Sequence, residues 1–82
     1  MLLTDYNTFR NKVGPALRCA VQPCRPLPGF LGTGEWEWNG FLHRGALAPD
    51  GFEVNVAAYV SNLSGYYFYH VLSRDDRATG LH

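Results

Sequence analysis

The stretch Phe52-Glu53-Val54-Asn55-Val56-Ala57-Ala58-Tyr59-Val60 carries the clearest periodic pattern in the chain. Every second residue from Phe52 to Val60 is apolar, so these side chains would share one face of an extended strand. The alternation predicts a central β-strand over residues 52–60. Glutamate and tryptophan alternate in residues 35–38, and residues 66–72 are rich in tyrosine, which predicts one strand on either side of it.

Two similar turns connect the three predicted strands. Pro49-Asp50-Gly51 and Leu63-Ser64-Gly65 both end in glycine, as a type I turn followed by a left-handed residue requires. The resulting register places Trp36 and Trp38 on the apolar face of the central strand. We therefore expect both indoles to be buried under a helix, and Trp38→Ala to cost about 3 to 5 kcal/mol.

Residues 5–21 show a different period. Their apolar side chains recur every three or four positions, which is the pattern of one helix face, and they are Tyr6, Phe9, Val13, Leu17, Ala20 and Val21. Gly14-Pro15 interrupts the run because proline lacks an amide hydrogen. The expected fold class is α+β: an N-terminal kinked helix, or two short helices, packed on a three-stranded antiparallel β-meander over residues 35–72.

The composition favours one small folded domain over residues 1–82. Hydrophobic residues make up 46% of the 82 positions and charged residues 17%, so the chain can bury a thin core and is unlike a disordered segment. Prolines and glycines concentrate in residues 22–34, which predicts a connecting loop. The polar residues 73–82 predict a solvated tail.

Charge and targeting signals narrow the class of partner. Seven basic and seven acidic residues give a formal net charge of zero, so no long-range field would attract a nucleic acid. The N-terminus lacks a basic region followed by an apolar run, and no segment approaches the roughly 20 apolar residues that cross a bilayer. We expect a cytoplasmic protein that does not contact a membrane.

The two cysteines predict neither a disulfide framework nor a metal site. Cys19 and Cys24 are too few for the disulfides of a small secreted domain. They are also too few for a four-ligand zinc site without histidines nearby. We expect two reduced thiols, and no metal or other cofactor.

One face of the predicted sheet has no helix over it and is rich in aromatic residues. In the predicted register Phe41, Tyr59 and Tyr69 form a row across the three strands, with Tyr67 and His43 beside it. Clustered aromatics on an exposed sheet face have the composition of a protein-binding patch. These five residues are the predicted partner-binding site. The alternative is that residues 22–34 or the C-terminal tail fold back over this face and make its aromatics part of the core.

The sequence therefore favours a small protein–protein interaction module over an enzyme, and no catalytic residue is assigned. Its partner would be another protein or a second copy of the chain. Inhibitors and adaptors that are encoded on mobile genetic elements are often of this size. One alternative is a single-stranded nucleic-acid binder that stacks bases on the same aromatics, although the acidic residues around them, Glu35, Glu37 and Glu53, oppose it. Another is a small hydrolase or nuclease that uses His43 and His70, since histidine titrates near neutral pH.

Overall fold

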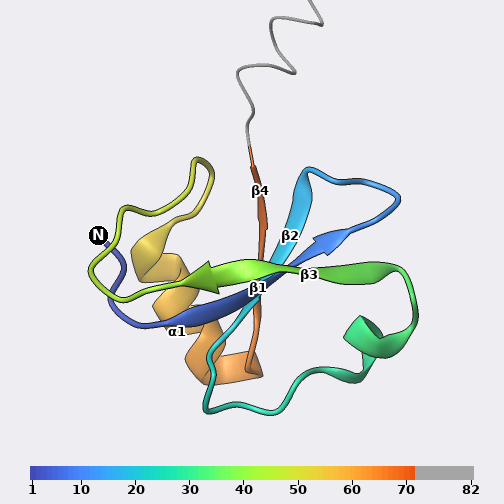
Figure 1. Ribbon diagram of the computed structural model, residues 1–82. Helices are drawn as coiled ribbons and strands as arrows, with labels where there is room; N and C mark the ends of the chain where they lie inside the picture. The colour runs from blue at the N-terminus through green and yellow to red at the C-terminus, as the bar shows by residue number, and fades with distance from the viewer. Residues whose placement is uncertain (72–82) are drawn as a thin grey trace, which may run out of the picture.

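The computed structural model describes residues 1–71. Its elements in chain order are β1 (Tyr6–Asn11), β2 (Leu17–Val21), the 3-10 turn η1 (Gly29–Gly32), β3 (Trp36–Leu42), α1 (Val54–Ser64) and β4 (Tyr67–His70). The strands form one antiparallel sheet of four in the order β3-β1-β2-β4. Figure 1 shows α1 lying against one side of this sheet, and η1 in the long connection that leads to β3.

The predicted fold class is wrong in the type and order of its elements. Residues 5–21, expected to form a kinked helix or two short helices, contain the β1–β2 hairpin. The expected central strand over residues 52–60 lies mostly in α1, the single helix late in the described chain. The sheet is thus four-stranded, and it is not a three-stranded meander. The predicted tail at residues 73–82 lies outside the described residues.

A tight turn explains why the N-terminal segment forms a hairpin. The side-chain oxygen of Asn11 accepts hydrogen bonds from the backbone N–H groups of Val13 at 3.0 Å and Gly14 at 2.9 Å. This Asx turn reverses the chain just before Pro15, which a helix interior would not accommodate. The apolar residues of this segment fit a helical period, yet the buried pair Tyr6 and Thr8 also fits a strand. The turn chemistry decides between the two periods.

Small inward-facing residues explain why the valine-rich segment forms a helix. Ala57 and Ser61, four residues apart, are its buried residues and let α1 approach the sheet closely. Val56 and Tyr59, expected on opposite faces of a strand, are both exposed. Gly65 ends the helix with φ of 92°, and its N–H donates to the carbonyl of Ser61 at 2.9 Å. A left-handed glycine serves a helix end as well as a hairpin, so Gly65 alone did not distinguish them.

The main core lies between α1 and the sheet. Phe52, just before the helix, makes edge-on contacts with Tyr6, Tyr67 and Tyr69 at ring-centroid distances of 5.4, 5.1 and 4.9 Å. The preceding Gly51 has φ of 87°, and a Cβ added there would lie 1.8 Å from the carbonyl oxygen of His70. Glycine at this position therefore lets the loop press against β4 and deliver Phe52 into the core.

The predicted burial of the two indoles under a helix is also wrong. Trp38 is opposite Phe9 in the β1–β3 ladder, and Phe9 points away from the face on which Tyr6 and Thr8 meet α1. Trp36 and Trp38 therefore lie on the other face of the sheet, where Trp38 is 63% exposed. The error follows from pairing β3 with residues 52–60, whereas its partner is β1.

Candidate functional site

The sheet face opposite α1 carries a second aromatic cluster. Phe30 of η1 lies over it, with its ring centroid 5.8 Å from Trp36, 5.2 Å from Tyr66 and 5.5 Å from Phe68. Trp36 and Phe68 stack with centroids 5.9 Å apart. Cys19, directly across from Phe68 on β2, is completely buried. Part of the 22–34 segment therefore does lie over an aromatic sheet face, but of the aromatics predicted for the covered face, Tyr59, Tyr67 and Tyr69 lie elsewhere.

Two aromatic residues of β3 remain outside the cover that Phe30 provides. Trp38 is 63% exposed and Phe41 is 37% exposed. They share one face because their partners on β1, Phe9 and Asn7, are two residues apart. The register shifts between these pairs, so Asn39 is an extra residue that forms a bulge in β3.

β3 is an edge strand, so one side of its backbone has no neighbour in the sheet. The Lys12 N–H donates to the Glu35 carbonyl at 2.8 Å, and Arg10 is opposite Glu37 two residues further along. In an antiparallel ladder the residues between such pairs direct their N–H and C=O groups the other way. Trp36 and Trp38 therefore turn these groups away from β1, and no other strand within residues 1–71 pairs with that side.

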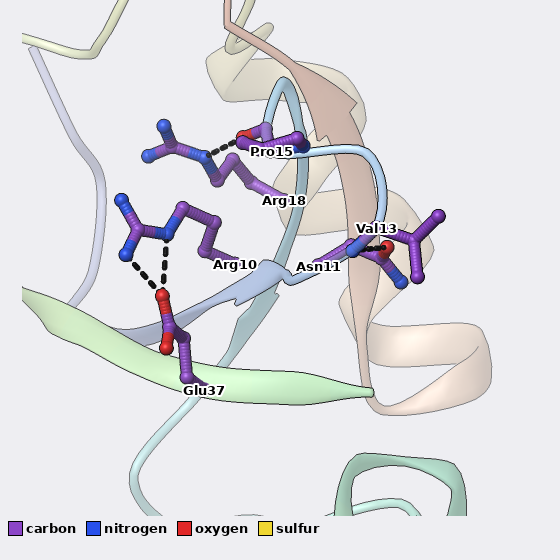
Figure 2. Close-up of polar contacts among 6 residues, drawn as sticks. All are labelled: Arg10, Asn11, Val13, Pro15, Arg18 and Glu37. Atoms are coloured by element: carbon purple, nitrogen blue, oxygen red, sulfur yellow. Dashed lines mark hydrogen bonds and ion pairs between the residues drawn. The ribbon is translucent and has the colours of Figure 1, made fainter. Parts of the chain in front are cut away.

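Acidic side chains alternate with the two indoles from Glu35, which directly precedes β3, to Trp38. Glu35 and Glu37 lie on the face opposite Trp36 and Trp38, because they occupy the intervening positions. One carboxylate oxygen of Glu37, Oε2, accepts hydrogen bonds from Nε of Arg10 at 2.8 Å and from Nη2 of the same residue (Figure 2). These bonds hold the pKa of Glu37 below its usual value, because they stabilise the ionised carboxylate. Its Oε1 has no hydrogen-bond partner among the described residues.

The ion pair of Glu37 belongs to a row of charges across three strands. Arg10 on β1 is directly opposite Arg18 on β2, an arrangement that is unfavourable for two like charges. Glu37 offsets the charge of Arg10, while Arg18 donates from Nε to the Pro15 carbonyl at 2.8 Å (Figure 2). The guanidinium of Arg10 is therefore paired with Glu37, and this ion pair fixes the position of the carboxylate at the edge of the sheet.

The structure does not bring the five predicted site residues together. Phe41 and His43 lie at the end of β3, with their ring centroids 4.7 Å apart. Tyr59 lies on the outer face of α1 and is 66% exposed. Tyr67 and Tyr69 pack in the main core, where burial raises the pKa of Tyr69 to about 12. The change of residues 54–64 from strand to helix accounts for this separation.

The residues considered for catalysis or metal binding are also apart. His43 follows β3 and His70 ends β4, which are the two opposite edges of the sheet. Cys19 and Cys24 are free thiols, and burial raises the pKa of Cys19 to about 12, so it stays protonated at neutral pH. Within residues 1–71 no group of three or more His, Cys, Asp and Glu side chains could hold a metal ion.

Two shallow hollows lie away from β3. One, of about 270 Å³, lies beside Arg25 and Tyr66, where Nη2 of Arg25 donates to the Asn62 carbonyl at 3.2 Å near the end of α1. The other, of about 540 Å³, is lined mainly by the apolar turn around Pro15, with His70 at its rim. Neither gathers the convergent polar groups that mark an active site.

The fold and these features define a small α+β domain with an exposed edge strand, which we call the β3 edge: Glu35, Trp36, Glu37, Trp38 and Phe41. Sequence reasoning missed Trp38 as a site residue, although the alternation Glu35-Trp36-Glu37-Trp38 was the signal for it.

Comparisons with known protein families, with curated proteins and with solved structures found no match to this chain. Among the described helices none has the length and apolar character needed to cross a membrane.

Proposed function

We propose that this chain is a small protein-binding module whose contact surface is the β3 edge. The observation that carries the proposal is the exposed indole of Trp38, 63% accessible on a strand whose outer backbone is unpaired. Tryptophan is among the residues that dominate binding energy when a partner removes them from water. Phe41 extends the same apolar surface, with His43 packed against its ring.

A module of this kind acts by occupying a surface on its partner, as inhibitors and adaptors encoded on mobile genetic elements do. The partner is another protein or a second copy of the chain. The proposal includes a cytoplasmic location, since the exposed free thiol of Cys24 suits a reducing compartment.

Single-stranded nucleic acid is a less favoured occupant of this edge. Trp38 and Phe41 offer rings on which bases could stack. However, Glu37 lies on the same strand and Glu35 directly precedes it, and both would repel the phosphate backbone. The neighbouring arginines already have partners: Arg10 donates to Glu37, and Arg18 donates to the Pro15 carbonyl.

The test compares two exposed aromatic residues on different elements. Wild type, Trp38→Ala and Tyr59→Ala are immobilised, and proteins retained from a lysate of the native host are quantified. Tyr59 is the matched control, because it is 66% exposed but lies on α1. We expect Trp38→Ala to weaken retention of a specific partner by about thirtyfold, the equivalent of roughly 2 kcal/mol, and Tyr59→Ala to retain it.

Sedimentation of the three proteins tests the second copy as partner in the same way. Loss of binding or of self-association with Tyr59→Ala but not with Trp38→Ala would move the contact to the outer face of α1. That outcome would contradict the proposal.

A further inference from the structure

We infer that the β3 edge receives an extended segment of a partner protein, with basic and apolar residues in alternation, which adds to the sheet beside β3. This inference rests on the proposed function and specifies the chemistry of the partner. Three features carry it: the outward backbone groups of β3, the alternation of its side chains, and the row of charges that ends at Glu37.

The backbone of β3 offers a short template for another strand. Trp36 and Trp38 both direct N–H and C=O groups to the outer side, and they are spaced by two residues, as ladder hydrogen bonds require. Beyond them the bulge at Asn39 and the left-handed Gly40, with φ of 120°, interrupt the regular edge. An added segment would therefore pair over about four or five residues and would end at the bulge.

The side chains of β3 dictate a pattern of period two in the added segment. Residues directly opposite one another on neighbouring antiparallel strands lie on the same face, with Cβ atoms about 5 Å apart. Residues opposite Trp36 and Trp38 would meet indole surface, so they should be apolar. Residues at the intervening positions would meet Glu35 and Glu37, so they should be basic.

The charges behind β3 reinforce the preference for a basic segment. On the inner side of β3, Arg10 is opposite Glu37, and the backbone N–H of Lys12 donates to the carbonyl of Glu35. Basic residues of the β1 segment therefore already lie next to acidic residues of the β3 segment. A basic residue on the outer side would continue this alternation, whereas an acidic residue would directly face a like charge. Oε1 of Glu37 remains open to a further donor, and Glu35 is exposed without an ion pair among the described residues.

The test uses two end-capped synthetic peptides, Ser-Lys-Val-Lys-Val-Lys-Ser and Ser-Glu-Val-Glu-Val-Glu-Ser, each labelled for fluorescence anisotropy at low salt. We expect the lysine peptide to bind about tenfold more tightly or better, since two opposed charge pairs change sign between the peptides. Glu35→Gln keeps the Arg10–Glu37 pair, and it should reduce this preference by about twofold to fivefold. Trp38→Ala should weaken binding of the lysine peptide by tenfold or more.

Methylated peptides test strand addition itself. N-methylation of the valines or of the lysines blocks alternate N–H groups, and only one of these two sets faces β3 in an added strand. Loss of binding with one methylated peptide and its retention with the other supports strand addition. Equal binding by both would contradict it.

The remaining outcomes separate this inference from the proposed function. If the two charged peptides bind the wild type equally and Trp38→Ala abolishes the binding of both, the inference of a basic partner segment is wrong. The proposal that the chain is a protein-binding module would remain. Absence of peptide binding overturns the inference too, and Trp38-dependent self-association would then identify a second copy as the occupant. If Trp38→Ala changes no interaction at all, the proposed function itself fails.

Discussion

The two faces of the sheet are covered by different means and to different depths. On one face the helix α1 and Phe52 enclose a core in which Tyr6, Tyr67 and Tyr69 are at most 7% exposed. On the other face the cover is Phe30, a half-buried residue from a single 3-10 turn. One helix can cover one face of a four-stranded sheet, and on the second face Phe30 covers Trp36 and Phe68 but leaves Trp38 and Phe41 exposed. The exposed aromatic side chains of the β3 edge follow from that unequal cover, while its unpaired backbone follows from the place of β3 at the end of the sheet.

The largest expected effect comes from removing the centre of the helix-covered face. Phe52→Ala should lower the free energy of unfolding by about 3 to 5 kcal/mol, because it deletes a buried ring and leaves a cavity. Three aromatic contacts at 4.9 to 5.4 Å are lost with it. Urea denaturation followed by circular dichroism measures the change.

Phe52→Leu is the control for this prediction. It keeps an apolar side chain at the site, so its cost should be well below that of alanine. A Phe52→Ala protein that unfolds at nearly the wild-type urea concentration would show that the core does not lie between α1 and the sheet.

A smaller effect is expected from the same change on the other face. Phe30→Ala should cost about 1 to 2 kcal/mol, since the ring is half-buried and each aromatic pair contributes roughly 0.5 to 1.5 kcal/mol. Because Phe30 lies against Trp36, the tryptophan emission of the folded protein should also shift to longer wavelength.

The comparison between the faces depends on the difference between these two variants. If Phe30→Ala is as destabilising as Phe52→Ala, the 3-10 turn closes its face as completely as α1 closes the other. The β3 edge would then lose its explanation as the uncovered part of the sheet.

The sequence predicted some strand segments but not their partners. The strands expected at residues 35–38 and 66–72 overlap β3 and β4. However, β3 pairs with β1, and β4 pairs with β2, and in neither pair are the two strands consecutive along the chain. Only β1 and β2 are neighbours both in the sheet and along the chain. Such non-local pairing leaves no local trace in composition or turn chemistry, and a register built from neighbouring segments places the wrong residues on each face.

The error at residues 52–60 arises because two periods coexist there. Valines at alternate positions favour a strand, while Ala57 and Ser61 mark the inner face of a helix. Burial in the tertiary structure selected the helical period. The glycines at 51 and 65 do have positive φ, as the predicted turns required, but Gly51 precedes the helix and Gly65 ends it.

The same error decided how much of the candidate site could be predicted. Phe41 and His43 were also assigned by pairing with residues 52–60, and they lie near the proposed edge because Phe41 belongs to β3 and His43 directly follows it. Tyr59, Tyr67 and Tyr69 were assigned by pairing with those residues, and the structure places them on a helix or in the core. Trp38 was assigned to the core by the same pairing.

The smallest expected effect on stability comes from the residue on which the proposed function depends. Trp38→Ala should change the free energy of unfolding by about 0.5 kcal/mol or less, because surface substitutions outside packed contacts are usually within this range. The indole is 63% exposed and has no stacked or edge-on ring partner within residues 1–71. Trp36→Ala is the internal comparison, since Trp36 contacts both Phe30 and Phe68 and should cost about 1 to 2 kcal/mol. Equal and large losses for both tryptophans in urea denaturation would mean that Trp38 is packed in the folded monomer. A packed indole could not be a free contact surface, so that result would contradict the exposed edge and the binding role that rests on it.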